Sequence, residues 1–373
     1  MKIEQIELYH ISMPLLHPFE TSYGLETHRE CILVAAHADG LVGWGEGVAS
    51  ARPDYSYETV GTCWHILSDF LIPGTLNQDW TEMEDLLALT AWVRGHQMAK
   101  AALQAAAWDL IAQRDAMSLA AKLAEPYQET RERVSVGVSI GIQPLIEDTL
   151  ARIEWFLGEG YGRIKLKIKP GRDLDLARAA RAAFPRVPLM LDANSAYTLA
   201  DAPLFRSMDD LGLLMIEQPL AHDDIFEHSK LQSQLETPLC LDESVHTPAQ
   251  AEWALEIDAG RIINIKPGRV GGLWEARQIH DICQAQNIPV WCGGMLETGI
   301  GRAANLAAAS LPNFTLPGDI SATERYWAQD IIEEVFTLNT EDSTITVPAG
   351  PGLGVTVSVP RIRKYQLRHE LFR

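Results

Sequence analysis

The chain has 373 residues, of which 47% are hydrophobic and 22% are charged, as in an ordinary globular protein. Its net charge of −19 argues against nucleic acid as a partner, because phosphate binding requires a basic surface. The five cysteines are odd in number and form no CxxC pair, and no uninterrupted apolar run is long enough to cross a membrane. We therefore expect a cytoplasmic protein with no disulfide framework and no membrane partner.

The N-terminal third has the pattern of a mixed α+β unit. Two runs, 3–15 and 30–47, are strand-like, and a polar segment, 17–29, separates them as a predicted loop. Residues 80–124 change character, because alanine becomes frequent and apolar residues take the spacing of a helix. We expect strands followed by helices in one unit over residues 1–127.

A regular strand–helix alternation follows this unit. Helical patterns separate short apolar runs that start 23 to 29 residues apart. This period is typical of βα units, which build parallel sheets. Eight runs predict a closed barrel of the (β/α)8 type rather than an open sheet. The runs are 134–140, 163–169, 189–195, 214–219, 239–244, 262–267, 289–295 and 316–320.

The alternation ends near the C-terminus. Strand and turn patterns return in residues 323–373, and glycine and proline are frequent around 348–354. We expect a barrel over residues 128–322, and a C-terminal segment that returns to pack against the N-terminal unit.

Three acids stand at the ends of consecutive predicted strands. Asp192, Glu217 and Asp242 each follow an apolar run and are 25 residues apart. In a βα barrel the carboxyl ends of the strands meet at the face where active sites lie, so these carboxylates should converge. Three carboxylates repel one another unless a cation lies between them. An oxygen-only ligand set without His or Cys is what Mg²⁺ prefers, so we predict magnesium rather than zinc.

Lysines flank the acids on both sides. Lys165, Lys167 and Lys169 alternate with aliphatic residues, so their side chains should share one face of a strand and point into the barrel. Lys266 ends the predicted strand beyond the acids. Nearby ammonium groups and a divalent cation should lower a lysine pKa from ~10.4 towards the ~7–8 that suits proton abstraction. Two lysines on opposite faces of a bound carboxylate can remove and return an α-proton, while the cation stabilises the enolate.

Each residue also has a simpler interpretation. A lone Asp at a strand end commonly caps a helix or a turn, alternating lysines are commonly solvated, and Trp291 and Met295 fit a plain apolar core. The combination on five successive βα units is what favours a site. Asn194 and Glu243 lie close to two of the acids in sequence. We expect them to support the acids, with Glu243 paired to Lys165, or else to bond within their loops.

This arrangement of lysines and acids resembles the enolase superfamily, in its muconate lactonizing enzyme subgroup, over nearly the whole chain. The segments KIKPGR, DANSAYT, IEQPL, DES, NIKPGRVGG and PGDIS are similar to those of the o-succinylbenzoate synthase / N-acylamino acid racemase family. The resemblance implies a modified TIM barrel, (β/α)7β, with an α+β N-terminal capping domain that the C-terminal segment completes.

The resemblance also implies a role for individual residues. The catalytic residues are Lys167 and Lys266. The supporting residues are Lys165, Asn194, Glu243 and Arg269. One Mg²⁺, for which Mn²⁺ can substitute, is bound by Asp192, Glu217 and Asp242. The substrate-binding residues fall in two groups. Those on the capping loop that closes over the site are Phe19, Ser22 and Tyr23, and those that hold the succinyl part of the substrate are Ser139, Gly293, Gly294, Met295 and Ile300.

Two reactions follow from the resemblance. One is dehydration of 2-succinyl-6-hydroxy-2,4-cyclohexadiene-1-carboxylate to o-succinylbenzoate, in menaquinone biosynthesis. The other is racemisation of N-succinyl or other N-acyl amino acids. Both use the same residues, so a dedicated racemase remains an alternative to a synthase that also racemises. Dipeptide epimerases typically carry a DxD pair after strand eight, and the single Asp319 disfavours them. The intact lysine pair disfavours a barrel without turnover. We expect a small carboxylate substrate and assembly into a homo-oligomer.

Overall fold

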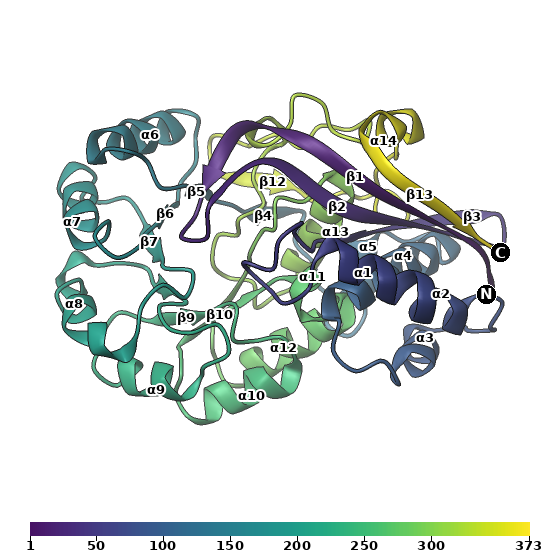
Figure 1. Cartoon of the computed structure of the whole chain (residues 1–373), viewed down its shortest axis with the longest axis horizontal. Helices are drawn as coiled ribbons and strands as arrows, with labels where there is room; N and C mark the ends of the chain where they lie inside the picture. The colour runs from purple at the N-terminus through teal and green to yellow at the C-terminus, as the bar shows by residue number, and fades with distance from the viewer.

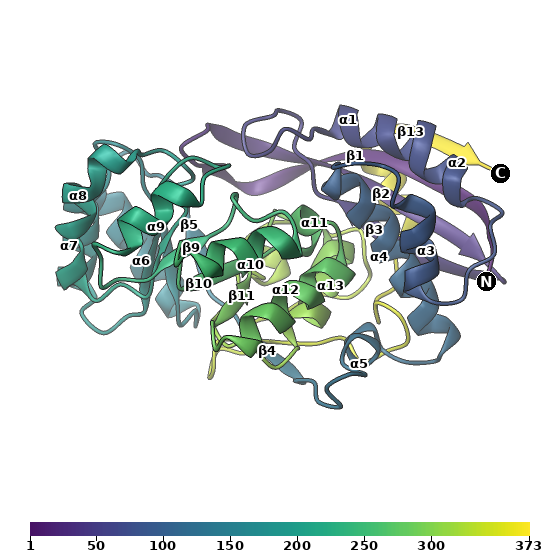
Figure 2. The same cartoon turned by 90° about the horizontal axis from the view of Figure 1, so that it is seen from below.

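The computed structural model describes all 373 residues and places an antiparallel sheet beside a curled parallel sheet (Figure 1). The antiparallel sheet has the order β13-β1-β2-β3. The C-terminal strand therefore pairs with the N-terminal one, and both chain ends lie at the same end of the molecule (Figures 1 and 2). Its strands are β1 (Ile3–Glu20), β2 (Leu25–Ala38), β3 (Leu41–Gly47) and β13 (Gln366–Phe372).

The β1–β2 hairpin is longer than expected, and the predicted polar loop over 17–29 is wrong. Strand β1 continues to Glu20 and β2 begins at Leu25, so that only four residues form the turn. The register shifts between Pro14 and Phe19, where proline cannot donate to the ladder. The outer part of the hairpin is polar because it extends past the rest of its sheet, and it reaches over the barrel towards β5 (Figure 1).

Helices cover the antiparallel sheet, and they begin at residue 60 rather than near residue 80. The longest of them packs closely on β3 because that strand carries glycines. A Cβ atom at Gly45 would overlap the carbonyl oxygen of Ala102, and one at Gly43 would overlap that of Ala106. The helices are α1 (Val60–Ile66), the π-helical η1 (Leu67–Leu71), α2 (Ile72–Thr75), α3 (Met83–Thr90), α4 (Gln97–Arg114) and α5 (Leu119–Leu123).

Seven of the eight predicted barrel runs form parallel strands, in the order β11-β10-β9-β8-β7-β6-β5. Sequential strands are therefore neighbours throughout the sheet, as the βα period predicts. The strands are β5 (Val138–Ile140), β6 (Ile164–Lys167), β7 (Leu189–Asp192), β8 (Ile216–Glu217), β9 (Leu239–Leu241), β10 (Ile262–Ile265) and β11 (Val290–Cys292).

The eighth run closes the ring without forming a regular strand. On one side the Asp319 amide donates to the Cys292 carbonyl; on the other side the Gly318 amide donates to the Ser135 carbonyl. Only an isolated bridge joins Val136 to Gly318, and Pro317 has no amide hydrogen to extend it. An α-helix follows each of the seven regular strands, but only a 3₁₀ turn, Thr323–Arg325, follows the eighth run, so the barrel is of the modified (β/α)7β kind.

Helices surround the barrel, and a short antiparallel pair lies below it. This pair is β4 (Arg133–Ser135) with β12 (Thr344–Thr346), and α14 (Val359–Tyr365) leads into β13. No helix is both long enough and apolar enough to cross a membrane. The barrel helices are α6 (Ile146–Gly158), α7 (Leu174–Ala183), α8 (Ala202–Arg206), α9 (Phe226–Gln232), α10 (Pro248–Glu256), α11 (Pro267–Val270), α12 (Leu273–Ala285) and α13 (Gly299–Ala309), with 3₁₀ turns η2 (Leu199–Asp201), η3 (Asp209–Leu211) and η4 (Thr323–Arg325).

A buried carboxylate joins the antiparallel sheet to the barrel. Glu46, in β3, accepts hydrogen bonds from the Thr298 amide (3.1 Å), the Thr298 hydroxyl (2.6 Å) and the Gly301 amide (3.0 Å) at the start of α13. A carboxylate at this end of a helix satisfies free amides and favours the helix dipole. Burial raises the pKa of Glu46 to about 7, although the Thr298 hydrogen bonds act against this rise.

The barrel interior has an apolar floor with a polar layer above it. Side chains two residues apart in a strand share a face, so the residue two positions after each floor residue also points into the barrel. The floor is a buried cluster of Met190, Met215, Cys240, Ile262 and Trp291. The inward positions above it, in the same strand order, are Asp192, Glu217, Asp242, Asn264 and Gly293.

Candidate active site

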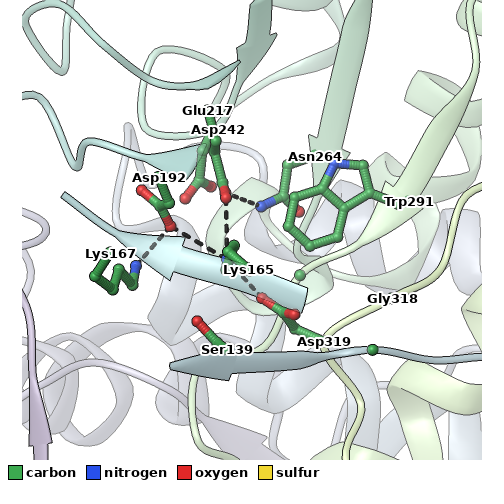
Figure 3. Close-up of polar contacts among 12 residues, drawn as sticks. Ser139, Lys165, Lys167, Asp192, Glu217, Asp242, Asn264, Trp291, Gly318 and Asp319 are labelled. Carbon is green, nitrogen blue, oxygen red and sulfur yellow. Dashed lines mark hydrogen bonds and ion pairs between the residues drawn. The ribbon is translucent and has the colours of Figure 1, made fainter. Parts of the chain in front are cut away.

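Strand register brings the predicted lysines and acids together. Lys167 lies opposite Asp192, and Asp192 lies opposite Glu217 on the next strand. Asp242 and Lys266 directly follow β9 and β10, and all five side chains are buried. Figure 3 shows the acids of three successive strands around the lysine side chains of β6.

Two lysines stand at opposite ends of the row of acids. The Nζ atom of Lys167 lies 2.5 Å from Asp192 Oδ2 and 2.7 Å from the side-chain oxygen of Asn194. The Nζ atom of Lys266 lies 2.7 Å from Asp242 Oδ2. A carboxylate bound between these ammonium groups would be approached from both sides.

Lys169 does not share the inward face, so the prediction of three inward lysines is wrong for this residue. Strand β6 ends at Lys167, and the chain then turns through a bridge between Lys169 and Arg172. The Lys169 side chain is 38% exposed, and its Nζ atom lies 3.2 Å from Glu20 Oε1 on the hairpin.

Lys165 occupies the centre of the acid cluster. Its Nζ atom lies 3.2 Å from Asp192, 3.0 Å from Glu217 and 2.5 Å from Asp319, and 4.9 Å from the centre of the Trp291 ring (Figure 3). Burial alone would lower the pKa of Lys165, but these carboxylates raise it well above its usual range. The nearest charges to Lys165 are therefore acids rather than other lysines.

The three predicted metal ligands are buried, and the pKa values of two of them, Asp192 and Glu217, shift in opposite directions. Burial acts to raise the pKa of Asp192, but Lys167 and Lys165 lower it by more, so the net result is a pKa below the ordinary value. Burial and the charge of Asp192 raise the pKa of Glu217. In this structure ammonium and guanidinium groups pair with the acids, and no three His, Cys, Asp or Glu side chains are arranged as a metal-binding group. The donor chemistry nevertheless fits Mg²⁺. The three side chains are all carboxylates, with neither His nor Cys among them, and a dication would offset the repulsion between their negative charges.

Asp242 is held by two cations and a phenol. Its Oδ1 accepts from a guanidinium NH of Arg269, while Lys266 bonds its Oδ2. The Tyr55 hydroxyl lies 3.0 Å from both Asp242 Oδ1 and Lys266 Nζ. Burial raises the pKa of Lys266's neighbour Tyr55, although Lys266 and Arg269 act against this rise. Arg269 therefore contacts one of the predicted metal ligands, and Tyr55 brings the capping segment into the same network.

Glu243 does not pair with Lys165, so that prediction is wrong. Its Oε1 atom accepts from the Tyr23 hydroxyl (2.7 Å) and from the Asn194 side-chain amide (3.2 Å). Ser22 also reaches this loop, with its hydroxyl 3.3 Å from the Asn194 carbonyl. The hairpin tip is thus tied to the loops that carry the acids.

A cavity of about 310 Å³ opens beside both terminal lysines, Lys167 and Lys266. Its walls come from the hairpin, from residues 50–55 and from the loop after β11. Four of the eight predicted substrate residues line it: Phe19, Tyr23, Gly294 and Met295.

The other four predicted substrate residues lie outside the cavity wall. Ser22 is next to it on the hairpin turn. Gly293 packs against the side chains of Asn264 and Lys266, and Ile300 is fully buried at the start of α13. The hydroxyl of Ser139 is buried without a hydrogen-bond partner. Substrate contact remains a prediction for all eight residues.

Sequence reasoning missed two members of the polar layer. Asn264 donates to Glu217 Oε1 at 2.7 Å, and it precedes Lys266 by two residues, so strand alternation alone could have found it. Asp319 lies 2.5 Å from Lys165 and 2.8 Å from Arg163, and these cations lower its pKa to about 2 against the effect of burial. Its position in the eighth run was the available signal.

Comparison with known proteins places the whole chain in one family. Residues 5–123 match the mandelate racemase / muconate lactonizing enzyme N-terminal domain, and residues 148–361 match the enolase C-terminal domain-like family. The chain is 49% identical to an o-succinylbenzoate synthase of Geobacillus kaustophilus, covering 100% of this chain and 98% of the relative. It is 46% identical to an N-succinylamino acid racemase of Thermus thermophilus, covering 98% of each.

A solved structure shows the same architecture. An enolase superfamily member from Listeria innocua superposes with a TM-score of 0.95 at 39% identity, covering 100% of this chain and 99% of that one. The superposition covers the antiparallel sheet as well as the barrel, because it spans the whole chain. The chain therefore belongs to the enolase superfamily, in the family that contains o-succinylbenzoate synthases and N-succinylamino acid racemases.

Proposed function

We propose that this enzyme is an o-succinylbenzoate synthase that also racemises N-succinyl and other N-acyl amino acids. The observation that carries the proposal is the pair of buried lysines, Lys167 and Lys266, at opposite ends of the acid row and on one cavity. Both reactions begin with removal of a proton next to a carboxylate, and this arrangement serves that step from either face. The likeness to relatives with both names supports the assignment.

In the dehydration, the Lys167 amine takes the proton from the carbon that carries the carboxylate. The bond to the ring hydroxyl then breaks, and the same lysine, now an ammonium group, returns its proton to the leaving hydroxide as water. The ring becomes aromatic, and no oxidant is needed. Lys266 stays protonated on the other face, where its charge stabilises the electron-rich ring.

In the racemisation, the two lysines exchange roles. One takes the α-proton of the N-acyl amino acid, and the other returns a proton to the opposite face. The product is the mirror-image amino acid, and the lysines end with their protonation states exchanged. Carboxylates hold Lys167 and Lys266 on opposite sides, so neither needs to move across the substrate.

We propose that Asp192, Glu217 and Asp242 hold one Mg²⁺, for which Mn²⁺ can substitute. When bound, such an ion would balance the negative charge that develops on the substrate carboxylate. Lys165 neutralises Asp192 and Glu217 from inside the barrel, Asn264 fixes the orientation of Glu217, and Arg269 does the same for Asp242. These residues would keep the acids oriented as ligands.

A dedicated N-succinylamino acid racemase is the second candidate, favoured by the similarity to a racemase over nearly the full chain. The contacts of Asp319 disfavour a dipeptide epimerase, because Lys165 and Arg163 already bind its carboxylate. We propose a cytoplasmic location, where five buried and unpaired cysteines stay reduced.

The first experiment gives the purified enzyme and Mg²⁺ two substrates side by side. The cyclohexadiene precursor is followed by ultraviolet absorbance, and N-succinylphenylglycine by polarimetry. Rapid dehydration supports the synthase. Racemisation without dehydration supports the dedicated racemase. The absence of both reactions would refute both proposals.

A further inference from the structure

Gln218 directly follows Glu217 and joins the loops that carry the predicted metal ligands. The residue is fully buried. Its carbonyl oxygen accepts from the Ser195 amide, in the loop after β7, at 2.8 Å, and its own amide donates to the Cys240 carbonyl, in β9, at 2.8 Å. The backbone of this one residue therefore bonds to the chain on both sides of β8.

The side chain of Gln218 adds a second set of hydrogen bonds, which reaches the turn after β9. Its Oε1 atom accepts from the backbone amides of Asp242 (2.9 Å) and Ser244 (3.3 Å). Its Nε2 atom donates to the Ser244 hydroxyl (2.5 Å) and to the Ala221 carbonyl (3.1 Å). A buried amide whose oxygen and nitrogen both have partners has one favourable orientation. The backbone of Asp242 is thereby fixed relative to that of Glu217.

The backbone of Gln218 is strained where it makes these bonds. Its φ of 37° lies in the left-handed region, which a residue with a side chain rarely adopts, and Pro219 restricts the backbone before it further. Such a conformation persists only where the surrounding structure holds it, and it is most common at functional sites. The strain and the full set of partners together indicate that the position of this residue matters to the site.

We propose that Gln218 is a positioning residue that holds the acid-bearing loops in place for the metal ion. The inference rests on the proposed function, in which Asp192, Glu217 and Asp242 bind one Mg²⁺. Without the ion these carboxylates repel one another, which favours separation of their loops. The hydrogen bonds of Gln218 oppose that separation, so the ligands need less rearrangement when the ion binds.

Gln232 offers a matched control at the other end of the barrel. It is also buried, its Oε1 atom accepts from the Leu239 amide at 2.7 Å, and its Nε2 atom lies 3.3 Å from the carbonyl oxygens of Leu235 and Thr237. Leu239 begins β9, so these bonds lie at the amino end of that strand, away from the acids. A substitution at Gln232 removes comparable bonds without affecting the acid-bearing loops.

The experiment measures the affinity of the metal-free enzyme for Mn²⁺, without substrate, from the electron paramagnetic resonance signal of the free ion. Gln218→Met keeps the side-chain volume but loses the hydrogen bonds. We expect its affinity to fall about 10- to 100-fold, as is common for residues that orient metal ligands. Gln232→Met should lower the thermal midpoint but leave the affinity within about twofold of wild type, because distant sites act independently. Ser244→Ala removes only the hydroxyl that accepts from Gln218, so we expect a smaller loss of about 2- to 10-fold.

Wild-type affinity in Gln218→Met would overturn the inference. Equal losses in Gln218→Met and Gln232→Met would overturn it as well, since they would reflect general destabilisation. If Gln218→Met does not fold, Ser244→Ala decides, and an unchanged affinity there would refute the role. A wild-type enzyme that binds no Mn²⁺ would instead refute the proposed metal site, and this inference with it. Because no substrate is used, the result does not depend on which reaction the enzyme catalyses.

Discussion

At the scale of single residues, Lys165 differs from the two lysines that flank it. Three carboxylates surround its ammonium group and raise its pKa, which favours the charged form. Its place between Asp192 and Glu217 suits a fixed counter-charge that keeps these acids close together. Asp319, on the closing run of the barrel, in turn fixes Lys165.

Asp319→Asn tests this chain of contacts. The change removes a buried carboxylate partner from both Lys165 and Arg163. We therefore expect kcat to fall about 10- to 100-fold and the thermal midpoint to drop. Steady-state kinetics and a thermal melt measure both effects. Asp342→Asn, which removes an exposed ion-pair partner of Arg133, is the control and should change neither. A kcat within twofold of wild type would show that Asp319 does not position Lys165.

Lys167→Ala and Lys266→Ala separate the roles proposed for the two lysines. Each should lower racemisation by about 10³-fold or more, because proton transfer by a positioned group contributes up to ~10⁴-fold. Proton exchange in D₂O, followed by NMR, should survive for only one enantiomer of N-succinylphenylglycine in each variant, and the surviving enantiomer should differ between them. Loss of exchange for both enantiomers in both variants would mean that the lysines do not act on separate faces.

The acids and the two terminal lysines could be predicted because their positions follow from two regular patterns, the βα period and the alternation of strand faces. The two side chains of the site that were placed wrongly lie in loops. Lys169 continues the alternation in sequence, but the strand ends before it. The partner of Glu243 depends on the loop after β7, where Asn194 and Ser195 adopt φ of 42° and 61°, values that no sequence pattern marked.

At the scale of elements, the closest packing joins β3 to α4 through glycine. Gly45→Ala should destabilise the protein by about 1–3 kcal/mol or more, because the added methyl group overlaps backbone atoms that cannot move separately. Urea unfolding measures the loss. Gly158→Ala in α6, where nothing lies within 4 Å of the new atom, should be neutral or slightly stabilising. Equal stability of the two variants would mean that α4 is free to shift.

The contact between Glu46 and α13 makes stability depend on pH. The pKa of Glu46 is about 7 in the folded chain against an ordinary 4.5. Between pH 4.5 and 7 the folded chain therefore keeps a proton on Glu46 that the unfolded chain has released. Its contribution to stability therefore falls as pH rises from about 4.5 to about 7, by up to about 3 kcal/mol. Glutamine does not titrate. The stability of Glu46→Gln relative to wild type should thus improve over this range, as measured by denaturant melts at several pH values. A constant difference would contradict the assignment.

Element types followed well from periodicity, and element ends did not. The barrel strands match the apolar runs because buried parallel strands are continuously apolar. The hairpin was missed because its outer residues face the cavity and solvent and lack an apolar side. The helices from residue 60 were missed because they are short and one turn is π-helical, which breaks the regular spacing.

At the scale of the whole molecule, the C-terminal strand covers the edge of the antiparallel sheet. Strand β13 pairs with β1 along residues 6–11 and is mostly exposed on its own faces. Deletion of residues 366–373 should leave the barrel folded but free the β1 edge, so we expect concentration-dependent association of the chain. Light scattering at increasing concentration measures this, with the full-length chain as the control. A deletion variant that stays monodisperse to the same limit as wild type would show that β13 does not protect this edge.

The global topology was predictable in outline because eight evenly spaced units leave few arrangements other than a barrel. The irregular form of the closing run was not predictable, since this run joins its neighbours through a few backbone bonds around Pro317. The return of the C-terminus was expected, but its register on β1 depends on contacts between residues more than 350 positions apart, which no local pattern encodes.

The hairpin tip, tied to the acid-bearing loops through Ser22 and Tyr23, also bears on how such an enzyme diversifies. The two lysines proposed to move protons lie in or directly after barrel strands, whereas much of the cavity wall belongs to the hairpin and to residues 50–55. Mutations can therefore accumulate in the wall while the proton chemistry stays intact. A lineage can exchange one carboxylate substrate for another by small steps, each of which leaves a working catalyst for selection to retain.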